Sequence, residues 1–344
     1  MKLVDVTGFG HSGKSSVVDF LKQYDAVFGF PNQVEFELFR VPGGLLDLYF
    51  AIYVSWNPIR ATTRINEFRK LVKRIGTIQT GSRPLTYFTA SGHGYEQYFN
   101  GRFIELSHRL IDKMTEQQIY TFWPYELLRM PYLTLFYKKL KSKFFNSLVS
   151  STVYFSDRDQ FIRDVRSYVE ALFAEVETNG ATHFLLSNAF DAYNPGPCLE
   201  MAGDACSIIV DRDPRDIYAS LIAPSEGFIP AVDQKKNMER IKKDMTGFND
   251  IHQFIARNKI IRGNVNDPGS DRILRLRYED FILDHERQAE RVKSFIGLPA
   301  GATITRAGFD ASKSSKNIGL WKKYRDTPEI KLIESELRQY CYQI

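Results

Sequence analysis

The hydrophobic pattern alternates between short apolar runs and helical spacing. An apolar run at 3–6 is followed, after a glycine-rich stretch, by apolar residues at helical spacing: Val17, Phe20, Leu21 and Tyr24. Further strands are predicted at 182–187, 207–210 and 272–276, and helices at 161–176, about 281–296 and 328–341. This alternation predicts a three-layer α/β/α fold, in which helices cover both faces of a central parallel sheet.

Residues 45–150 have a different pattern. They are predicted to be mostly helical, with breaks where proline and glycine occur. Residues 51–150 carry 15 Lys/Arg against 6 Asp/Glu, together with 18 aromatic residues. We therefore interpret 1–344 as a single domain with a helical insertion at 45–150. The insertion would face an anionic or sugar-like partner, or a membrane surface. The alternative is a helical subdomain with aromatic residues in its core and lysines in solvent.

The glycine-rich stretch has the spacing of a phosphate-binding loop (P-loop). Residues 8–15 read Gly-Phe-Gly-His-Ser-Gly-Lys-Ser, directly between the predicted strand and helix. In such a loop, backbone N–H groups surround a phosphate and the following helix directs its positive end at it. Lys14 would supply a cation and Ser15 a hydroxyl. The alternative is a glycine-rich turn that binds nothing.

Composition sets limits on the class of protein. Hydrophobic residues make up 43% of the chain and charged residues 25%, as in a globular protein. No apolar run approaches the length of a membrane span, and the chain enters its first strand without a signal-peptide pattern. The three cysteines have neither metal nor redox spacing. These features predict a cytoplasmic protein. No nucleic-acid motif accompanies the basic segment, so a nucleic-acid partner is not expected.

A second group of charged residues follows the predicted strand 207–210. Residues 211–216 read Asp-Arg-Asp-Pro-Arg-Asp, and Ser220 lies eight residues after Arg212. Pro214 suits the first turn of a helix, which would bring Ser220 within reach of a group that Arg212 holds. An arginine and a hydroxyl suit a second phosphate. The alternative is a salt-bridged helix start, in which Asp211 and Asp213 pair with Arg212 and Arg215.

The loop and the 211–220 segment together resemble the sulfotransferases that use 3′-phosphoadenosine 5′-phosphosulfate (PAPS). Residues 276–281 (Leu-Arg-Tyr-Glu-Asp-Phe), followed by 295–298, resemble that family's Tyr-Glu-Asp strand end and the helix after it. Residues 312–322, with Asn-Ile-Gly-Leu-Trp-Lys at the end, resemble a segment near the family's C-terminus. The sequence of residues 210–218 (Val-Asp-Arg-Asp-Pro-Arg-Asp-Ile-Tyr) is similar to a segment of bacterial polysaccharide sulfotransferases.

The resemblance implies roles for matching positions. PAPS is the implied donor and 3′-phosphoadenosine 5′-phosphate (PAP) the product, with no metal required. Arg212 and Ser220 would bind the 3′-phosphate, while Tyr278, Glu279 and Asp280 would be architectural. Trp321 would be a core or lid residue. The 5′-phosphosulfate would lie on the loop residues Gly10, His11, Ser12, Gly13, Lys14, Ser15 and Ser16. The segment that closes over the nucleotide would include Lys313, Lys316, Asn317 and Gly319.

The chain departs from the family at two places. Its loop lysine, Lys14, occupies the position typical of nucleotide triphosphatases, where many family members have threonine. Some members also place a lysine where this chain has 186–188 (Leu-Ser-Asn). The first departure leaves a P-loop kinase or nucleotide triphosphatase as an alternative. In that alternative Asp211 would hold a metal and Ser15 would bind magnesium.

Sulfonyl transfer needs a general base for the acceptor hydroxyl, and Lys14 would stabilise the leaving phosphate. Four candidate bases are considered: Glu35, Glu37, His11 and His93. Some similar sulfotransferases carry a glutamate base in the region of 35–37. If that segment is a strand, only one of its two glutamates can face the site, because successive side chains alternate.

The sequence thus predicts a PAPS-dependent sulfotransferase that acts by in-line displacement. The favoured acceptor is a carbohydrate: a cell-surface polysaccharide, a lipopolysaccharide or a related glycan precursor, including a lipid-linked one. The alternatives are a P-loop kinase or nucleotide triphosphatase, a sulfotransferase acting on a small alcohol or phenol, and a non-catalytic nucleotide-binding member. The sequence does not indicate the oligomeric state.

Overall fold

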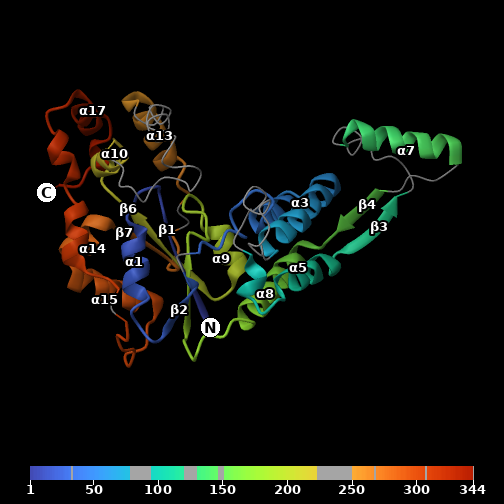
Figure 1. The fold of residues 1–344 in the computed structure, drawn as a ribbon, viewed down its shortest axis with the longest axis horizontal. Helices are drawn as coiled ribbons and strands as arrows, with labels where there is room; N and C mark the ends of the chain where they lie inside the picture. The colour runs from blue at the N-terminus through green and yellow to red at the C-terminus, as the bar shows by residue number, and fades with distance from the viewer. Residues whose placement is uncertain are drawn as a thin grey trace, which may run out of the picture. The chain divides into compact units, whose positions relative to one another are not determined.

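The computed structural model describes residues 1–31, 34–77, 94–119, 130–145, 151–222, 250–266, 269–306 and 308–343. The chain forms two compact units (Figure 1). The first comprises 1–36, 178–199 and 204–344, and the second comprises 37–177 and 200–203. The second unit contains the whole of 45–150 and extends beyond it at both ends. The division into one domain with an insertion at 45–150 remains a prediction.

The first unit contains a five-stranded sheet in the order β2-β5-β1-β6-β7, and every described pairing in it is parallel (Figure 1). The strands are β1 (Lys2–Gly8), β2 (Val27–Gly29), β5 (His183–Ser187), β6 (Ala205–Asp211) and β7 (Ile273–Arg277). In the register, Val6 lies opposite Ser187 and Gly8 opposite Val210. The segments that follow β1, β5 and β6 therefore meet at one edge of the sheet, where ligands of such sheets bind.

Alternation along β1 separates the two faces of the sheet. Val4 and Val6 pack in a core with α1 (Lys14–Leu21), α14 (Tyr278–Leu283) and α15 (His285–Ile296). On the opposite face, Ile209 packs with Phe9 and with Ile261 of α13 (Ile251–Gly263). Helices thus cover both faces, and the predicted three-layer fold is confirmed.

The helices of the C-terminal part form a separate small core. Trp321 and Ile333 pack there with Phe254. The elements of this part are α10 (Pro214–Ile222), α16 (Ala311–Ser314), the 3-10 helices η5 (Ser315–Asn317), η6 (Leu320–Tyr324) and η7 (Arg338–Tyr340), and α17 (Pro328–Glu336). Helix α9 (Gly196–Ala202) does not belong to this core and precedes β6 in the chain. Trp321 is therefore a core residue, one of the two roles that the resemblance implied.

Three expectations for this unit need correction. The helix predicted at about 281–296 is two helices, which meet at Asp284. The helix predicted at 328–341 ends at Glu336 and is followed by a 3-10 turn. Tyr278, Glu279 and Asp280 open α14 and do not lie at a strand end, because β7 stops at Arg277.

The second unit is mostly helical, as predicted, and has a core rich in aromatic residues. The helices described in this unit are α2 (Leu45–Leu48), the π-helical η2 (Tyr49–Val54), α3 (Pro58–Gly76), η3 (Tyr95–Gln97), α5 (Phe103–Asp112), α7 (Tyr132–Phe145) and α8 (Arg158–Ala174). Phe99 stacks on Phe103 at 5.7 Å and meets Phe173 edge-on at 5.6 Å. Four aromatic residues of the basic segment, Phe68, Tyr95, Phe99 and Phe103, are thus core residues.

The sequence patterns did not predict an antiparallel pair of strands in this unit. β3 (Thr115–Ile119) pairs with β4 (Ser151–Phe155). β3 reads Thr-Glu-Gln-Gln-Ile and has no apolar alternation, which explains why the pattern did not reveal it. Among the described residues, no helix is both long and apolar enough to span a bilayer.

Candidate functional site

The loop between β1 and α1 has the backbone of a phosphate cradle. His11 and Gly13 take left-handed conformations, with φ of 61° and 82°. A Cβ at Gly13 would lie 2.4 Å from the ring of Tyr278, so both the backbone and the packing require glycine there. At Gly10, in contrast, an added Cβ would meet nothing within 4 Å. The loop is thus held against the protein at Gly13 and open at Gly10.

Lys14, at the start of α1, faces a carboxylate. Its Nζ lies 3.8 Å from Oε1 of Glu35, and the two side chains are 23% and 33% exposed. Both groups remain partly open to solvent at the edge of the loop. A cation and an acceptor of protons are therefore adjacent, as a transfer reaction on a bound phosphosulfate would need.

Asn188 fixes the position of Glu35. Its Nδ2 donates to Oε2 of Glu35 at 3.0 Å, and its Oδ1 accepts from the buried Thr7 hydroxyl at 3.1 Å. Asn188 follows β5 directly and has a φ of 55°, which asparagine tolerates better than most residues. The next residue, Ala189, donates its N–H to Asp5 of β1 at 2.9 Å. The turn after β5 is thus fastened to β1, and it presents an amide to the carboxylate.

Arg212 joins three parts of the chain at the edge of the sheet. Its Nη1 donates to the carbonyl of His11 at 3.2 Å, and its Nη2 donates to the carbonyl of Asn317. The guanidinium lies over the ring of Tyr278, 5.2 Å from its centre. Tyr278 in turn donates its hydroxyl to the carbonyl of Ser314 at 2.8 Å. Arg212 and Tyr278 therefore connect the phosphate loop to the segment 314–317.

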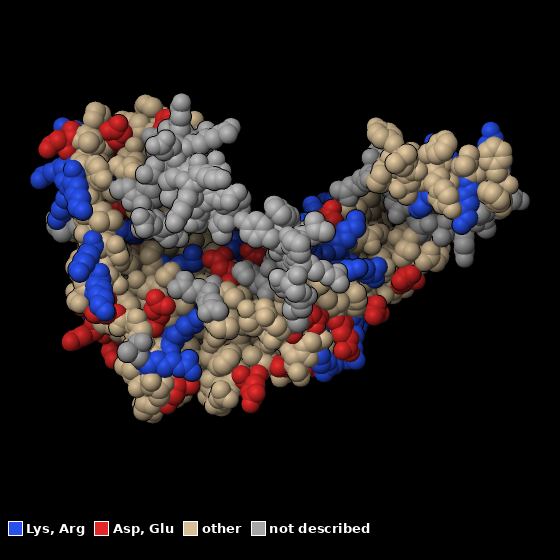
Figure 2. All heavy atoms as spheres, in the orientation of Figure 1, with Lys and Arg blue, Asp and Glu red and all other residues tan. Residues whose placement is uncertain are grey.

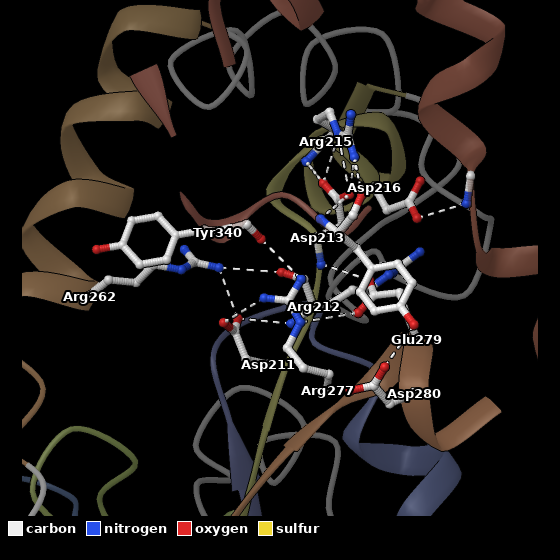
Figure 3. A network of polar contacts seen from close by, with 12 residues as sticks. Asp211, Arg212, Asp213, Arg215, Asp216, Arg262, Arg277, Glu279, Asp280 and Tyr340 are labelled. Carbon is white, nitrogen blue, oxygen red and sulfur yellow. Dashed lines mark hydrogen bonds and ion pairs between the residues drawn. The ribbon is translucent and has the colours of Figure 1, made fainter. Parts of the chain in front are cut away.

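The acidic residues around Arg212 pair with other arginines (Figure 3). Asp211 accepts from Arg262 at 2.8 Å and lies 3.7 Å from Arg277. Asp213 accepts from Arg215, with a shortest distance of 2.7 Å. The alternative of a salt-bridged helix start is thus correct for Asp213 and Arg215 and wrong for Asp211 and Arg212.

Two buried carboxylates stabilise the same region. Asp216 accepts from the backbone N–H groups of Gly319, at 2.8 Å, and Trp321, at 3.1 Å, and so holds the start of η6 (Figure 3). Glu279 accepts from the N–H of Asp213 at 2.7 Å. Burial raises the pKa of both carboxyl groups above their ordinary values. These acids organise backbone segments and are fully buried, so they are poor candidates for a base.

His11 lies in a cationic environment. Burial, and then the charges of Arg212, Lys14 and Arg257, lower the pKa of His11 below its ordinary value of 6.5. The imidazole is therefore held in its neutral form at neutral pH. A neutral imidazole can accept a proton, so His11 stays a candidate base.

The structure places the other predicted residues as follows. Ser12 is buried, and Ser15 is exposed. Ser220 donates its hydroxyl to the carbonyl of Ile217 at 2.7 Å, within its own helix. Glu37 belongs to the second unit and is not in a strand, so the alternation expected for 35–37 does not apply. His93 lies outside the described residues. Ser16 is partly buried, and Lys316 is exposed. The side chain of Lys313 is 81% exposed, and its Nζ lies 3.8 Å from Oδ2 of Asp310.

Sequence reasoning did not assign roles to Asn188 and Asp216. In the sequence Asn188 stands out only as part of a departure from the family, and Asp216 only as part of a charged run. The position of Asn188 directly after a strand that neighbours β1 was the signal available, but using it requires the strand order.

Comparison with known proteins bears on these residues directly. Residues 156–301 match the model of the sulfotransferase family. The resemblance to sulfotransferases is confirmed. The matched sulfotransferase segment contains Asn188, Arg212 and Tyr278, whereas the phosphate loop and 312–322 lie outside it. No curated protein sequence matches the chain.

Solved structures of sulfotransferases also align with the chain. Sulfotransferase STF9 from Mycobacterium avium is 13% identical, with a TM-score of 0.37, and the alignment covers 98% of this chain and 76% of that one. The sulfotransferase domain from the curacin biosynthetic pathway is 11% identical, with a TM-score of 0.37 and coverage of 100% and 98%. Sulfotransferase STF1 from Mycobacterium tuberculosis H37Rv is 12% identical, with a TM-score of 0.33 and coverage of 92% and 76%. The three-layer fold is shown by the parallel sheet and by the helices on both of its faces.

Proposed function

We propose that the protein transfers the sulfonate of PAPS to a hydroxyl group of a carbohydrate. The observation that carries this proposal is the group formed by the phosphate loop, Lys14 and Glu35, in a chain whose residues 156–301 match sulfotransferases. The loop would hold the 5′-phosphosulfate, and Glu35 would stand beside it as the base. The donor and the acceptor class are both part of the proposal.

Two unused polar groups favour an anionic ligand at this edge. Among the described residues, the Ser12 hydroxyl and Nε of Arg212 are buried and have no hydrogen-bond partner. A buried donor without a partner costs free energy, which a bound phosphate would recover. Among the residues that the structure describes, two of the five N–H groups of Arg212 donate to carbonyls, which leaves three for a 3′-phosphate. Ser220 would have to turn away from Ile217 to donate to the same group.

The chemistry follows from these positions. The acceptor oxygen would attack the sulfur in line with the bond to the leaving phosphate oxygen. Glu35 would take the proton of the acceptor hydroxyl, and the S–O bond to the nucleotide would break. Lys14 and the backbone N–H groups of the loop would stabilise the negative charge that returns to the 5′-phosphate of PAP. Asn188 would hold Glu35 in place during the transfer.

The carbohydrate acceptor is proposed from the second unit. Its basic residues suit an acidic glycan, and exposed aromatic side chains such as Trp56 and Phe50 offer faces on which sugar rings pack. We place the reaction inside the cell, where the donor is made. An alcohol or phenol acceptor would satisfy the same loop chemistry, so the acceptor must be determined by assay.

The arrangement around Asp211 disfavours the kinase alternative. That alternative needs Asp211 as a metal-holding acid, but its two oxygens face Arg262 and Arg277. Binding a magnesium ion there would break both ion pairs. The pairing of Asp211 supports a nucleotide site that uses arginine and backbone groups.

Transfer of radiolabelled sulfonate tests the proposal. The protein is incubated with 35S-labelled PAPS and separate panels of acidic glycans, lipid-linked glycans and phenols. We expect label in a glycan fraction with the wild type and with Lys331→Ala, an exposed lysine on α17, and none with Lys14→Ala. Label in phenols alone would overturn the carbohydrate acceptor. The absence of label in every panel, together with hydrolysis of ATP, would overturn the proposed reaction.

A further inference from the structure

Helix α7 (Tyr132–Phe145) exposes the type of side chain that helices of globular proteins normally bury. Tyr132 is 90% exposed, Leu133 84% and Phe136 65%, and Phe144 and Phe145 are also exposed. The helix has no buried residue along its 14 positions. Contiguous exposed apolar surface of this kind marks an interaction site.

Five of the seven exposed apolar residues of α7 form one stripe along the helix, and Tyr132 and Phe145 at its two ends lie outside it. Leu133, Phe136, Tyr137, Leu140 and Phe144 follow the spacing i, i+3, i+4, i+7, i+11. At 3.6 residues per turn they span about 100° of arc. We call these five residues the α7 stripe.

The side of α7 opposite the stripe is the side that the protein partly covers. Leu135, Lys138 and Ser142 are the half-buried positions of the helix, and they lie about 180° from the centre of the stripe. The helix therefore presents its apolar stripe away from its supported side. An amphipathic helix that packs on the core of its own domain buries its apolar face, whereas α7 exposes it.

Charge on α7 has a single sign. The helix contains Lys138, Lys139, Lys141 and Lys143 and no Asp or Glu. On the helical wheel, Lys139 and Lys143 border one edge of the stripe and Lys141 borders the other. Figure 2 shows the described surface of α7 in tan and blue. A ligand for this face must bury apolar side chains and also neutralise lysines on both sides of them.

We propose that α7 lies on the surface of an anionic lipid bilayer. An apolar stripe bordered by lysines is the pattern of an interfacial helix, in which the apolar face enters the acyl boundary and the lysines reach anionic headgroups. The hydroxyl of Tyr137 would remain at headgroup level while its ring is buried. A second copy of the chain is a poorer occupant, because pairing two α7 helices would bring eight lysines together without an acid on either helix. This proposal does not depend on the sulfotransferase proposal.

Sedimentation with vesicles tests the proposal on the full chain. The protein is mixed with vesicles of phosphatidylcholine alone, or with about one third phosphatidylglycerol. We expect binding to the anionic vesicles that falls steeply with added salt, and little binding to the neutral ones. The double variant Phe136→Ser with Leu140→Ser should bind at least tenfold more weakly, since it removes two apolar side chains that would be buried in the bilayer.

Two further variants keep the result interpretable. Lys139→Gln with Lys141→Gln retains the helix and the stripe, and it should lose most anionic selectivity. Ile260→Ser with Leu283→Ser removes exposed apolar side chains outside α7 and should bind like the wild type. Equal binding by the stripe variant and the wild type would overturn the proposal, as would failure of the wild type to bind anionic vesicles. Sedimentation velocity that shows a dimer, lost only in the stripe variant, would replace the bilayer with a second copy.

Discussion

Glu35 is held between a cation and an amide: its Oε1 lies 3.8 Å from Nζ of Lys14, and its Oε2 accepts from Nδ2 of Asn188 at 3.0 Å. The three residues come from the phosphate loop, the segment after β2 and the turn after β5. This relationship places the cation of the loop beside a group that can accept a proton.

Replacing the carboxylate of Glu35 should remove general-base catalysis. We expect Glu35→Gln to lower kcat by about 10²- to 10⁴-fold with little change in PAP affinity. Steady-state kinetics with the labelled donor and calorimetry with PAP measure the two quantities. Glu286→Gln, an exposed residue on α15, is the matched control. If Glu37→Gln or His11→Asn abolished transfer while Glu35→Gln retained it, the base would have to be reassigned.

Removing the amide of Asn188 should misplace Glu35 without straining the backbone. Asn188→Gly keeps the left-handed conformation, and we expect about a tenfold lower kcat. The KM for PAPS should stay close to the wild-type value, because the phosphate loop is intact and only the carboxylate is misplaced. Asn179→Gly, at an exposed residue with a φ of 51°, controls for the backbone effect. An unchanged kcat in Asn188→Gly would show that Asn188 does not position Glu35 for the reaction.

The two loop glycines should respond differently to the same substitution. Gly13→Ala places a methyl group 2.4 Å from the Tyr278 ring at a φ of 82°, and we expect the free energy of unfolding to fall by at least about 1–2 kcal/mol. Gly10→Ala should change it by less than about 0.5 kcal/mol, because its Cβ direction is open. Urea denaturation monitored by circular dichroism measures both values. Equal losses in the two variants would contradict the described packing.

The lowered pKa of His11 predicts a pH dependence of stability. Below a pH of about 6.5, the pKa of the unfolded histidine, the unfolded chain binds a proton that the folded chain binds more weakly. The contribution of His11 to the free energy of unfolding is therefore complete above that pH. It is lost as the pH falls through the lower, folded pKa of His11. His11→Asn, which tolerates the φ of 61°, should therefore lose less stability than the wild type between about pH 6.5 and pH 5. Parallel curves of the free energy of unfolding against pH would disprove this account of His11.

The parts of the fold that sequence predicted were those fixed by local pattern. The apolar run before Gly8 and the helical spacing after Lys14 define β1 and α1 without reference to distant residues. The buried strands around 183–187 and 205–211 were recognisable for the same reason. The pairing of β3 with β4 was not recognisable, because residues 115–118 are polar at successive positions and β4 begins more than 30 residues after β3 ends.

The site was predicted as a set of residues but not as a network. That Asp211 pairs with Arg262, 51 positions away, depends on where α13 packs, and no spacing in the sequence indicates it. The hydrogen bond from the Ser220 hydroxyl to the carbonyl of Ile217 depends on the side-chain rotamer of Ser220, which the helical backbone does not determine. Asn188 reaches Glu35 only because β5 is next to β1, which the order of elements along the chain does not specify.

The most direct test of the central claim is a calorimetric titration of PAP into the protein without added metal. We expect saturable one-to-one binding, which weakens by about 1.5–3 kcal/mol in Arg212→Ala and falls at least tenfold in Lys14→Ala, but is unchanged in Lys331→Ala. Thermal unfolding of each variant checks that it is folded. Binding of ATP with magnesium in place of PAP, or PAP affinity that neither Arg212→Ala nor Lys14→Ala alters, would contradict the claim.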